Sequence, residues 1–124
     1  SDNWMKASIE YENEEYQRLG SVVTNNGYSD WATHDISSSI KEMWYRLSRR
    51  GSDYYIETSL DGTTFHQMRT FHLDKGDGEI SFGIYAASPV DHSFTAQFSE
   101  MEVGECKWQP WSAEDTGFKQ TANK

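Results

Sequence analysis

Cysteine is almost absent from this sequence, because Cys106 is the only one in 124 residues. A single thiol cannot form a disulfide within the chain, so nothing points to a disulfide-stapled secreted scaffold. Metal motifs are also missing: there is no CxxC pair or EF-hand loop, and no histidine pairs with another at i+2 or i+4. We therefore expect no metal ion and no cofactor, and we expect Cys106 to be a surface or tail thiol.

Positive charge is scarce as well. Eleven Lys and Arg residues face 20 Asp and Glu residues, which gives a net charge of −9 and a pI of about 4.7. This balance argues against a nucleic-acid backbone or an anionic membrane as the main partner. No apolar run approaches membrane-spanning length and no signal peptide opens the chain, so we expect a cytoplasmic location. A mature secreted protein without disulfides fits the same observations.

Hydrophobic residues are few, at 35%, but aromatic residues are abundant, at 15%. The chain is long enough for one domain or part of one, with a small core. Much of that core must consist of Trp, Tyr and Phe, whose polar tips need hydrogen-bond partners. The residues that we expect to be mostly buried are Met5, Ile9, Tyr45, Leu47, Ile56, Phe82, Ile84, Phe94 and Phe98.

The clearest pattern lies in residues 43–62, where two sets of side chains alternate at every second position. Turn residues at Gly51 and at Asp61-Gly62 divide and end the alternation. The pattern therefore predicts a β-hairpin with one face toward a core and the other outward. The outward face is rich in groups suited to binding, namely Trp44, Arg46, Tyr55 and Glu57.

Similar alternation predicts more strands, with Asn25-Asn26-Gly27 as a strong turn because Asn and Gly tolerate positive φ. The alternation slips near Met68, which indicates a bend or β-bulge. About eight short strands, frequent turns and no long helix predict an all-β antiparallel sandwich. The further expected strands are 4–11, 19–24, 29–35, 63–73, 80–87 and 94–103.

Several short motifs follow one another in order along residues 4–103. They are Trp4-Met-Lys-Ala-Ser-Ile-Glu-Tyr11, Ser21-Val-Val-Thr24, Ser29-Asp-Trp31, Arg49-Arg-Gly51, Ser59-Leu-Asp-Gly62, Gly83-Ile-Tyr-Ala-Ala-Ser-Pro89 and Phe94-Thr-Ala-Gln-Phe98. In this order and spacing the chain resembles the DUF1349 family, which includes regulator-of-enolase and YesU-like proteins. The resemblance implies a concanavalin A-like jelly-roll β-sandwich, the architecture of many lectins and glucanases, and no defined activity.

The first motif stands in a different place from that in the family. There, the strand that matches Trp4-x-Lys6-x-x-x-Glu10 follows several earlier strands, whereas here it opens the chain. The resemblance thus implies that residues 1–104 are the C-terminal portion of a DUF1349-like domain, followed by a polar tail at 105–124. A sandwich lacking strands has open edges. We therefore expect a second chain that supplies strands, or a homo-oligomer, and no stable isolated monomer.

Polar and aromatic residues on the outward faces are the candidate binding residues. Strand alternation and the sandwich prediction place most of them on one sheet face, lining one depression, where flat rings can stack on sugar C–H faces. Ordinary packing and an exposed ion pair between Lys6 and Glu10 are the alternatives. The predicted ligand-binding residues are Trp4, Lys6, Glu10, Trp31, Arg46, Tyr55, Glu57 and Tyr85.

These observations favour a carbohydrate-binding or carbohydrate-metabolism accessory domain without catalysis of its own. One alternative is a glycoside-active enzyme that uses Glu10 and Glu57 as its two carboxyl groups. A retaining glycosidase needs two such groups roughly 5 Å apart. The other alternative is a protein-interaction or regulatory module, as the regulator-of-enolase resemblance suggests.

Overall fold

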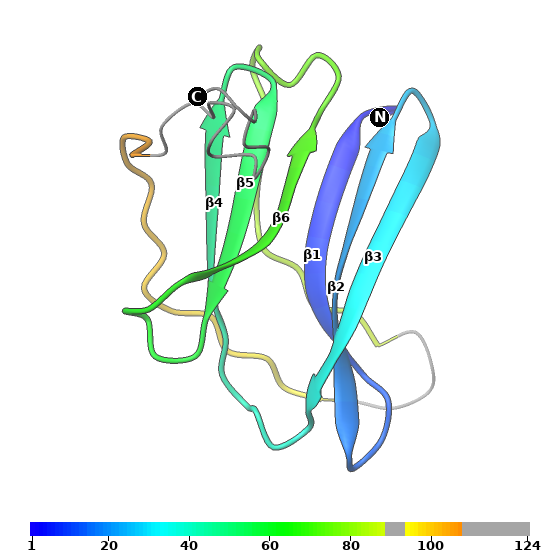
Figure 1. Cartoon of the computed structure of the whole chain (residues 1–124), viewed down its shortest axis with the longest axis vertical. Coiled ribbons are helices and arrows are strands. Elements are labelled where there is room, and N and C mark those ends of the chain that lie inside the picture. The colour runs from blue at the N-terminus through cyan, green and yellow to red at the C-terminus, as the bar shows by residue number, and fades with distance from the viewer. Residues whose placement is uncertain (89–93, 108–124) are drawn as a thin grey trace, which may run out of the picture.

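The computed structural model describes residues 1–88 and 94–107. These residues form six β-strands in two antiparallel sheets and contain no helix (Figure 1). Sheet A has the strand order β1-β2-β3, and sheet B has the order β4-β5-β6. The predicted all-β antiparallel architecture is therefore confirmed. The strands are β1 Trp4–Tyr11, β2 Tyr16–Asn25, β3 Tyr28–Ser37, β4 Trp44–Arg50, β5 Asp53–Ser59 and β6 His66–His72.

Sheet A consists of two hairpins that share the central strand β2. In the β1–β2 turn, the side-chain oxygen of Asn13 accepts hydrogen bonds from the backbone N–H groups of Glu15 and Tyr16, at 2.8 and 3.1 Å. In the β2–β3 turn, Asn26 and Gly27 have φ angles of 53° and 82°. These left-handed values are the ones that Asn and Gly tolerate best. The β2–β3 turn lies at the predicted Asn25-Asn26-Gly27 motif, and both turns set the register of β2 against its neighbours.

Sheet B has the same up-and-down order, with Gly51 at a φ of 61° in the β4–β5 turn. The pairing of β5 with β6 shifts register between Ile56 and Glu57. Met68 is the extra residue of β6 at this shift, so the strand contains the bulge that the slipped alternation predicts.

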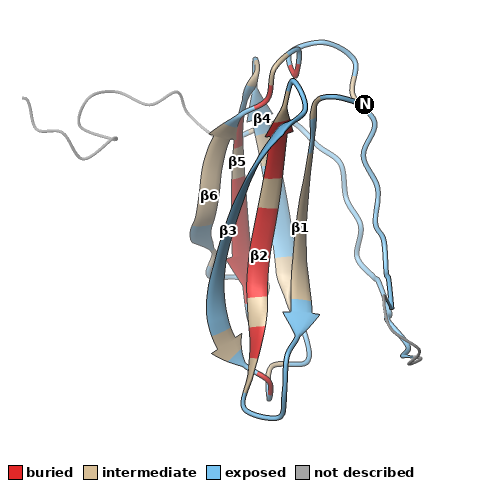
Figure 2. Ribbon diagram, turned by 90° about the vertical axis from the view of Figure 1, so that its right-hand side faces the viewer, coloured by how far each residue is buried: buried red, intermediate tan, exposed pale blue. Residues whose placement is uncertain are grey.

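The core between the sheets is small and centres on β2 and β5, where Figure 2 shows most of the burial. Tyr54 is 1% exposed and stacks on Phe71 with ring centroids 5.3 Å apart. Its hydroxyl donates a hydrogen bond of 2.7 Å to the carbonyl of Gly76, which is the partner that a buried Tyr needs. The buried hydrophobic residues are Leu19, Val23, Tyr54, Ile56 and Leu73.

One arginine connects the two sheets and shows which faces look inward. Arg69 of β6 lies 3.1 Å from the carboxylate of Asp30 on β3 and donates to the hydroxyl of Ser21 on β2 at 3.3 Å. Ser21 therefore faces sheet B. Because successive side chains of a strand point to opposite faces, Leu19 and Val23 share this inner face with Ser21, whereas positions 20 and 22 look outward.

The two apolar segments that follow β6 do not form the predicted strands. Residues 80–88 and 94–107 contain no strand and run as loops beside the sheets (Figure 1). Without a strand ladder, their side chains have no sheet face on which to pack. The predicted burial is wrong for Phe82, Ile84, Phe94 and Phe98, which are 50% to 65% exposed.

The remaining predicted core residues have mixed burial. Ile56 is buried as predicted, and Met5 and Ile9 are half-buried. Tyr45 and Leu47 of β4 are 42% and 44% exposed, so the prediction that they are mostly buried is wrong. The reason is the position of β4, which is an edge strand and lies behind the β1 side of sheet A in Figure 2, where sheet A ends.

No helix within the described ranges is long and apolar enough to span a membrane. In the same ranges, no group of three or more His, Cys, Asp or Glu side chains is placed to hold a metal ion. His92, Pro89 and most of the predicted polar tail lie outside the described residues.

Candidate functional site

The two sheets separate the residues that the sequence predicts on one face. Trp4, Lys6 and Glu10 lie on β1 of sheet A. The register places Lys6 opposite Val22, which alternates with the inward-facing Ser21. All three β1 residues therefore point away from sheet B.

Arg46 and Glu57 occupy the corresponding outer face of sheet B. They are direct partners on β4 and β5, and both alternate with residues that face sheet A. Tyr55 lies on the same face as Glu57, two positions away. The prediction of one shared depression is therefore wrong, because β1 belongs to one sheet and β4 and β5 belong to the other.

Tyr85, the last predicted binding residue, belongs to neither sheet. It lies in the segment 80–88, near Tyr45 of β4. Partial burial raises the pKa of Tyr45 to about 12, and the nearby Tyr85 adds to this increase. Tyr85 therefore lies near an inward-facing residue of β4 and in no strand of either outer face.

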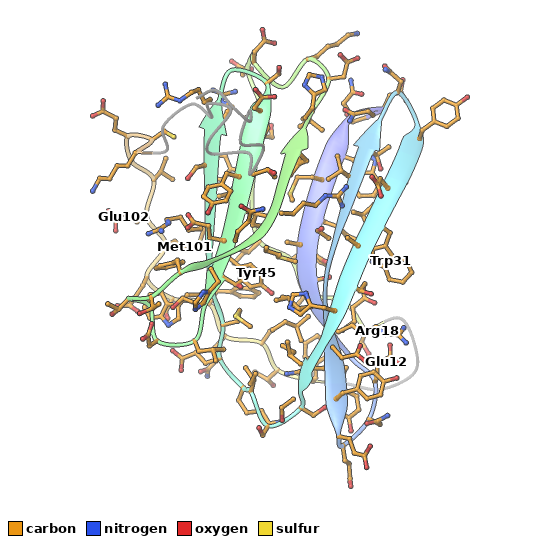
Figure 3. The ribbon with its side chains drawn as sticks, in the orientation of Figure 1. Glu12, Arg18, Trp31, Tyr45, Met101 and Glu102 are labelled. Atoms are coloured by element: carbon orange, nitrogen blue, oxygen red, sulfur yellow. The ribbon has the colours of Figure 1, made fainter. Side chains whose placement is uncertain are left out.

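Trp31 of β3 is the centre of an aromatic surface on the outer face of sheet A. Its indole lies close to Gly20, since a Cβ added at Gly20 would be 3.3 Å from Trp31 Nε1. The register puts Trp31 in one row with Val22 and Lys6, and Trp4 lies one row further along β1. Trp31 is 58% exposed and projects from sheet A on the side away from sheet B (Figure 3). We call these five residues, Trp4, Lys6, Gly20, Val22 and Trp31, the sheet A platform.

Polar side chains border the sheet A platform at both ends. At one end Arg18 lies 3.3 Å from Glu12 and 4.0 Å from Asp35, and Figure 3 shows Arg18 and Glu12 below Trp31. At the other end, the hydroxyls of Thr24 and Ser29 are hydrogen-bonded at 2.7 Å. The outer face of sheet A therefore offers an exposed apolar ring with charged and hydroxyl groups within reach.

The outer face of sheet B holds a closed ion-pair cluster. Arg46 donates to both carboxylate oxygens of Glu57, at 2.9 and 3.2 Å, and its guanidinium carbon lies 3.8 Å from the ring centroid of Phe65. The hydrogen bond that Arg46 donates to Glu57 raises the pKa of Arg46. Burial, followed by the charge of Glu57, raises the pKa of Tyr55. The guanidinium of Arg46 and the carboxylate of Glu57 already satisfy each other. The cluster therefore links β4 to β5 and leaves neither charge free to bind a ligand.

Phe65 was not among the predicted site residues. The sequence predicted it within a strand over 63–73, but β6 begins at His66, so Phe65 lies in the β5–β6 loop. Its contact with Arg46 depends on how that loop folds back over sheet B. A lone Phe beside a turn gives no sequence pattern that indicates a cation–π contact.

A groove of about 280 Å³ opens between the sheets, and the sequence did not predict it. Several of its polar groups already have partners. Arg69 pairs with Asp30, and the side chain of Asn25 bonds the His72 carbonyl at 2.9 Å and the Asp74 N–H at 2.6 Å. The contributing strands are distant in sequence, so no local motif marks the groove. It is lined by Val23, Asn25, Tyr28, Asp30, Arg69, Thr70, Phe71 and His72.

Comparison with known proteins places the chain in a family. Residues 1–106 match the family described as Protein of unknown function (DUF1349). Among solved structures, the chain is similar to a functionally unknown protein from Saccharomyces cerevisiae, with 30% identity and a TM-score of 0.51. The similarity covers 58% of this chain and 38% of the yeast chain, and no protein with a curated description matches. Because the family match extends over most of its length, the chain belongs to the DUF1349 family.

Proposed function

We propose that this protein binds carbohydrate without catalysis, through the sheet A platform. The observation that carries the proposal is the exposure of Trp31, whose ring lies over a position without a side chain. A bulkier residue at position 20 would push the indole away from the sheet. The platform is thus a preformed flat aromatic surface, which reduces the entropy that binding has to offset.

The chemistry of the surface fits a sugar ring. A pyranose has an apolar C–H face that packs on an indole, and it has hydroxyl groups at its edge that need hydrogen-bond partners. Lys6 lies in the same row as Trp31, Trp4 lies one row further along β1, and Arg18 lies at the border of the platform. The net charge of −9 also disfavours acidic polymers, so a neutral or cationic glycan is the best match.

Catalysis by Glu10 and Glu57 does not fit this arrangement. The two carboxylates lie on the outer faces of different sheets, with both layers of the sandwich between them. A glycosidase must place its two carboxyl groups on either side of one glycosidic bond, within about 10 Å of each other. We therefore propose a binding function in place of hydrolysis.

Resemblance at the family level adds support of a weaker kind. Regulator-of-enolase and YesU-like proteins, and the concanavalin A-like architecture in general, link this type of sandwich to sugar binding and metabolism by analogy. The single cysteine is in keeping with a reducing, cytoplasmic location.

Glycan-array binding of the full chain tests the proposal, followed by titration of any bound glycan with two variants. Trp31→Ala should lower the affinity at least tenfold, which corresponds to ~1.4 kcal/mol. Tyr28→Ala is the matched control, because Tyr28 is an exposed aromatic residue on the same strand that lines the groove. Loss of binding in Tyr28→Ala but not in Trp31→Ala would move the site to the groove and contradict the proposal.

A protein-interaction function is the second candidate, and a different observation favours it. The segments 80–88 and 94–107 expose a series of large apolar side chains, which is uncommon on a soluble monomer. Exchanging three of them for Ser should abolish capture of a protein partner and leave glycan binding unchanged. The exposed residues are Phe82, Ile84, Tyr85, Phe94, Phe98, Met101 and Val103.

A further inference from the structure

We propose that β1 pairs with β1 of a second copy of this chain, so that the two copies of sheet A form one continuous sheet. The pairing is antiparallel about a two-fold axis at Ser8. It brings Lys6 of each copy opposite Glu10 of the other. The proposal rests on strand edges and charges, and it holds whether or not the protein binds glycans.

The outer edge of β1 has no strand paired with it among the described residues. This strand of eight residues pairs with β2 on one side only. Among the described residues, no other segment makes a backbone hydrogen bond to its outer side. An open edge presents a row of N–H and C=O groups and is a template for another strand.

The charge pattern of β1 is complementary to itself in an antiparallel pair. With Ser8 of the two copies opposite each other, the residues two places away on either side meet, and these are Lys6 and Glu10. Opposite charges that face each other across strands stabilise the pair. Neither Lys6 nor Glu10 has an ion-pair partner within the described part of the chain, so both charges are available.

The inner face of β1 is apolar in the same register. Ala7 of one copy meets Ile9 of the other, and Met5 meets Tyr11. Met5, Ala7 and Ile9 are only half-buried in the single chain, and Tyr11 is exposed. Pairing therefore brings four partly covered apolar residues of each copy into contact with their counterparts.

The other three edges lack this complementarity. β4 contains Arg46, Arg49 and Arg50 but no acid, so pairing with itself would add like charges. β3 contains Asp30 and Asp35 but no Lys or Arg. β6 carries a bulge and an arginine that already crosses to sheet A. Pairing of the basic β4 with the acidic β3 of another copy is disfavoured because Arg46 is held by Glu57 and Asp30 by Arg69.

The position of β4 also favours an added strand beside β1. Figure 2 shows β4 behind the β1 side of sheet A, where sheet A ends. Tyr45 and Leu47 face inward there and are still more than 40% exposed. A strand added at the edge of β1 extends sheet A toward this region. It takes the place of residues 80–88, which run down the same side of β1 in Figure 2 and are mostly exposed.

A charge exchange tests the register. Lys6→Glu and Glu10→Lys should each raise the dimer dissociation constant at least about tenfold in sedimentation equilibrium, because each puts two like-charged pairs opposite each other. The double variant, with Lys6→Glu and Glu10→Lys together, should restore the wild-type value. Lys41→Glu makes the same change of charge on an exposed loop and should have no effect.

A disulfide test does not depend on those variants. In a Cys106→Ser background, Ser8→Cys should form a covalent dimer on mild oxidation, because residues directly opposite across strands have Cα atoms ~4.5–5.5 Å apart. Thr33→Cys on β3, in the same background, should stay monomeric on a denaturing gel. A wild-type chain that sediments as a monomer overturns the proposal. The proposal is also overturned if neither charge reversal changes the dimer dissociation constant, or if the Thr33→Cys variant forms the covalent dimer.

Discussion

Tyr54 is the largest fully buried side chain of the described residues, and the contributions of its ring and its hydroxyl can be separated by mutation. Its ring fills the space between β5 and the loop at Gly76, and its hydroxyl donates to the Gly76 carbonyl at 2.7 Å. Tyr54→Ala removes both functions and should lower the free energy of unfolding by about 3–5 kcal/mol. Tyr54→Phe removes the hydroxyl alone.

The smaller loss in Tyr54→Phe follows from the second donor at the same carbonyl. Arg49 Nη1 also donates to the Gly76 carbonyl, at 3.0 Å, so this oxygen keeps one hydrogen bond in the variant. The loss should therefore be close to one ordinary hydrogen bond, about 1 kcal/mol. Urea unfolding at a fixed protein concentration measures both values, since self-association makes stability depend on concentration. Equal losses in the two variants, or a loss below about 1 kcal/mol in Tyr54→Ala, would refute this account of the core.

Two further predictions follow from burial and from local electrostatics. Ile56→Ala should cost about 2–5 kcal/mol, whereas Phe98→Ala should cost less than about 1 kcal/mol because Phe98 is 50% exposed; thermal melts compare the two. The backbone N–H groups of Thr64 and Thr63 lower the pKa of Asp61 to about 2. A lowered pKa means that Asp61 stabilises the fold above its unfolded value of 3.8 and loses this effect as the pH falls toward 2. An NMR titration midpoint near 4 for Asp61 would contradict the assignment.

The first six strands could be predicted because local chemistry determines them. Asn13 and the Asn25-Asn26-Gly27 turn place the ends of β1, β2 and β3, and Gly51 does the same for β4 and β5. Even the bulge at Met68 is visible as a slip in alternation. Each of these features depends on a few neighbouring residues, so the sequence is sufficient to locate it.

The segments after β6 show the limit of the same reasoning. Residues 80–87 alternate as regularly as β1, yet they form no ladder in the structure. Alternation says that a segment suits a strand with one apolar face. It does not say whether a neighbouring strand and an opposing sheet are present, and burial depends on both.

The candidate site was only partly predictable for a related reason. Alternation correctly assigns Trp4, Lys6 and Glu10 to one face of a strand, and the same holds for Arg46 and Glu57 through their pairing. Alternation does not show which strands share a sheet. The prediction therefore assigned residues from the outer faces of sheet A and sheet B to a single face. The contact of Trp31 with Gly20 depends on the register of β2 and β3, which no single strand reveals.

The most direct test of the account is the indole N–H resonance of Trp31 during a glycan titration. The chain has five tryptophans, and Trp31→Phe identifies the resonance by its disappearance. Binding at the sheet A platform predicts that the Trp31 resonance shifts first and most, while that of Trp44 on sheet B stays in place. Shifts confined to Trp44, or to residues of the inter-sheet groove such as Phe71 and Thr70, would contradict the account.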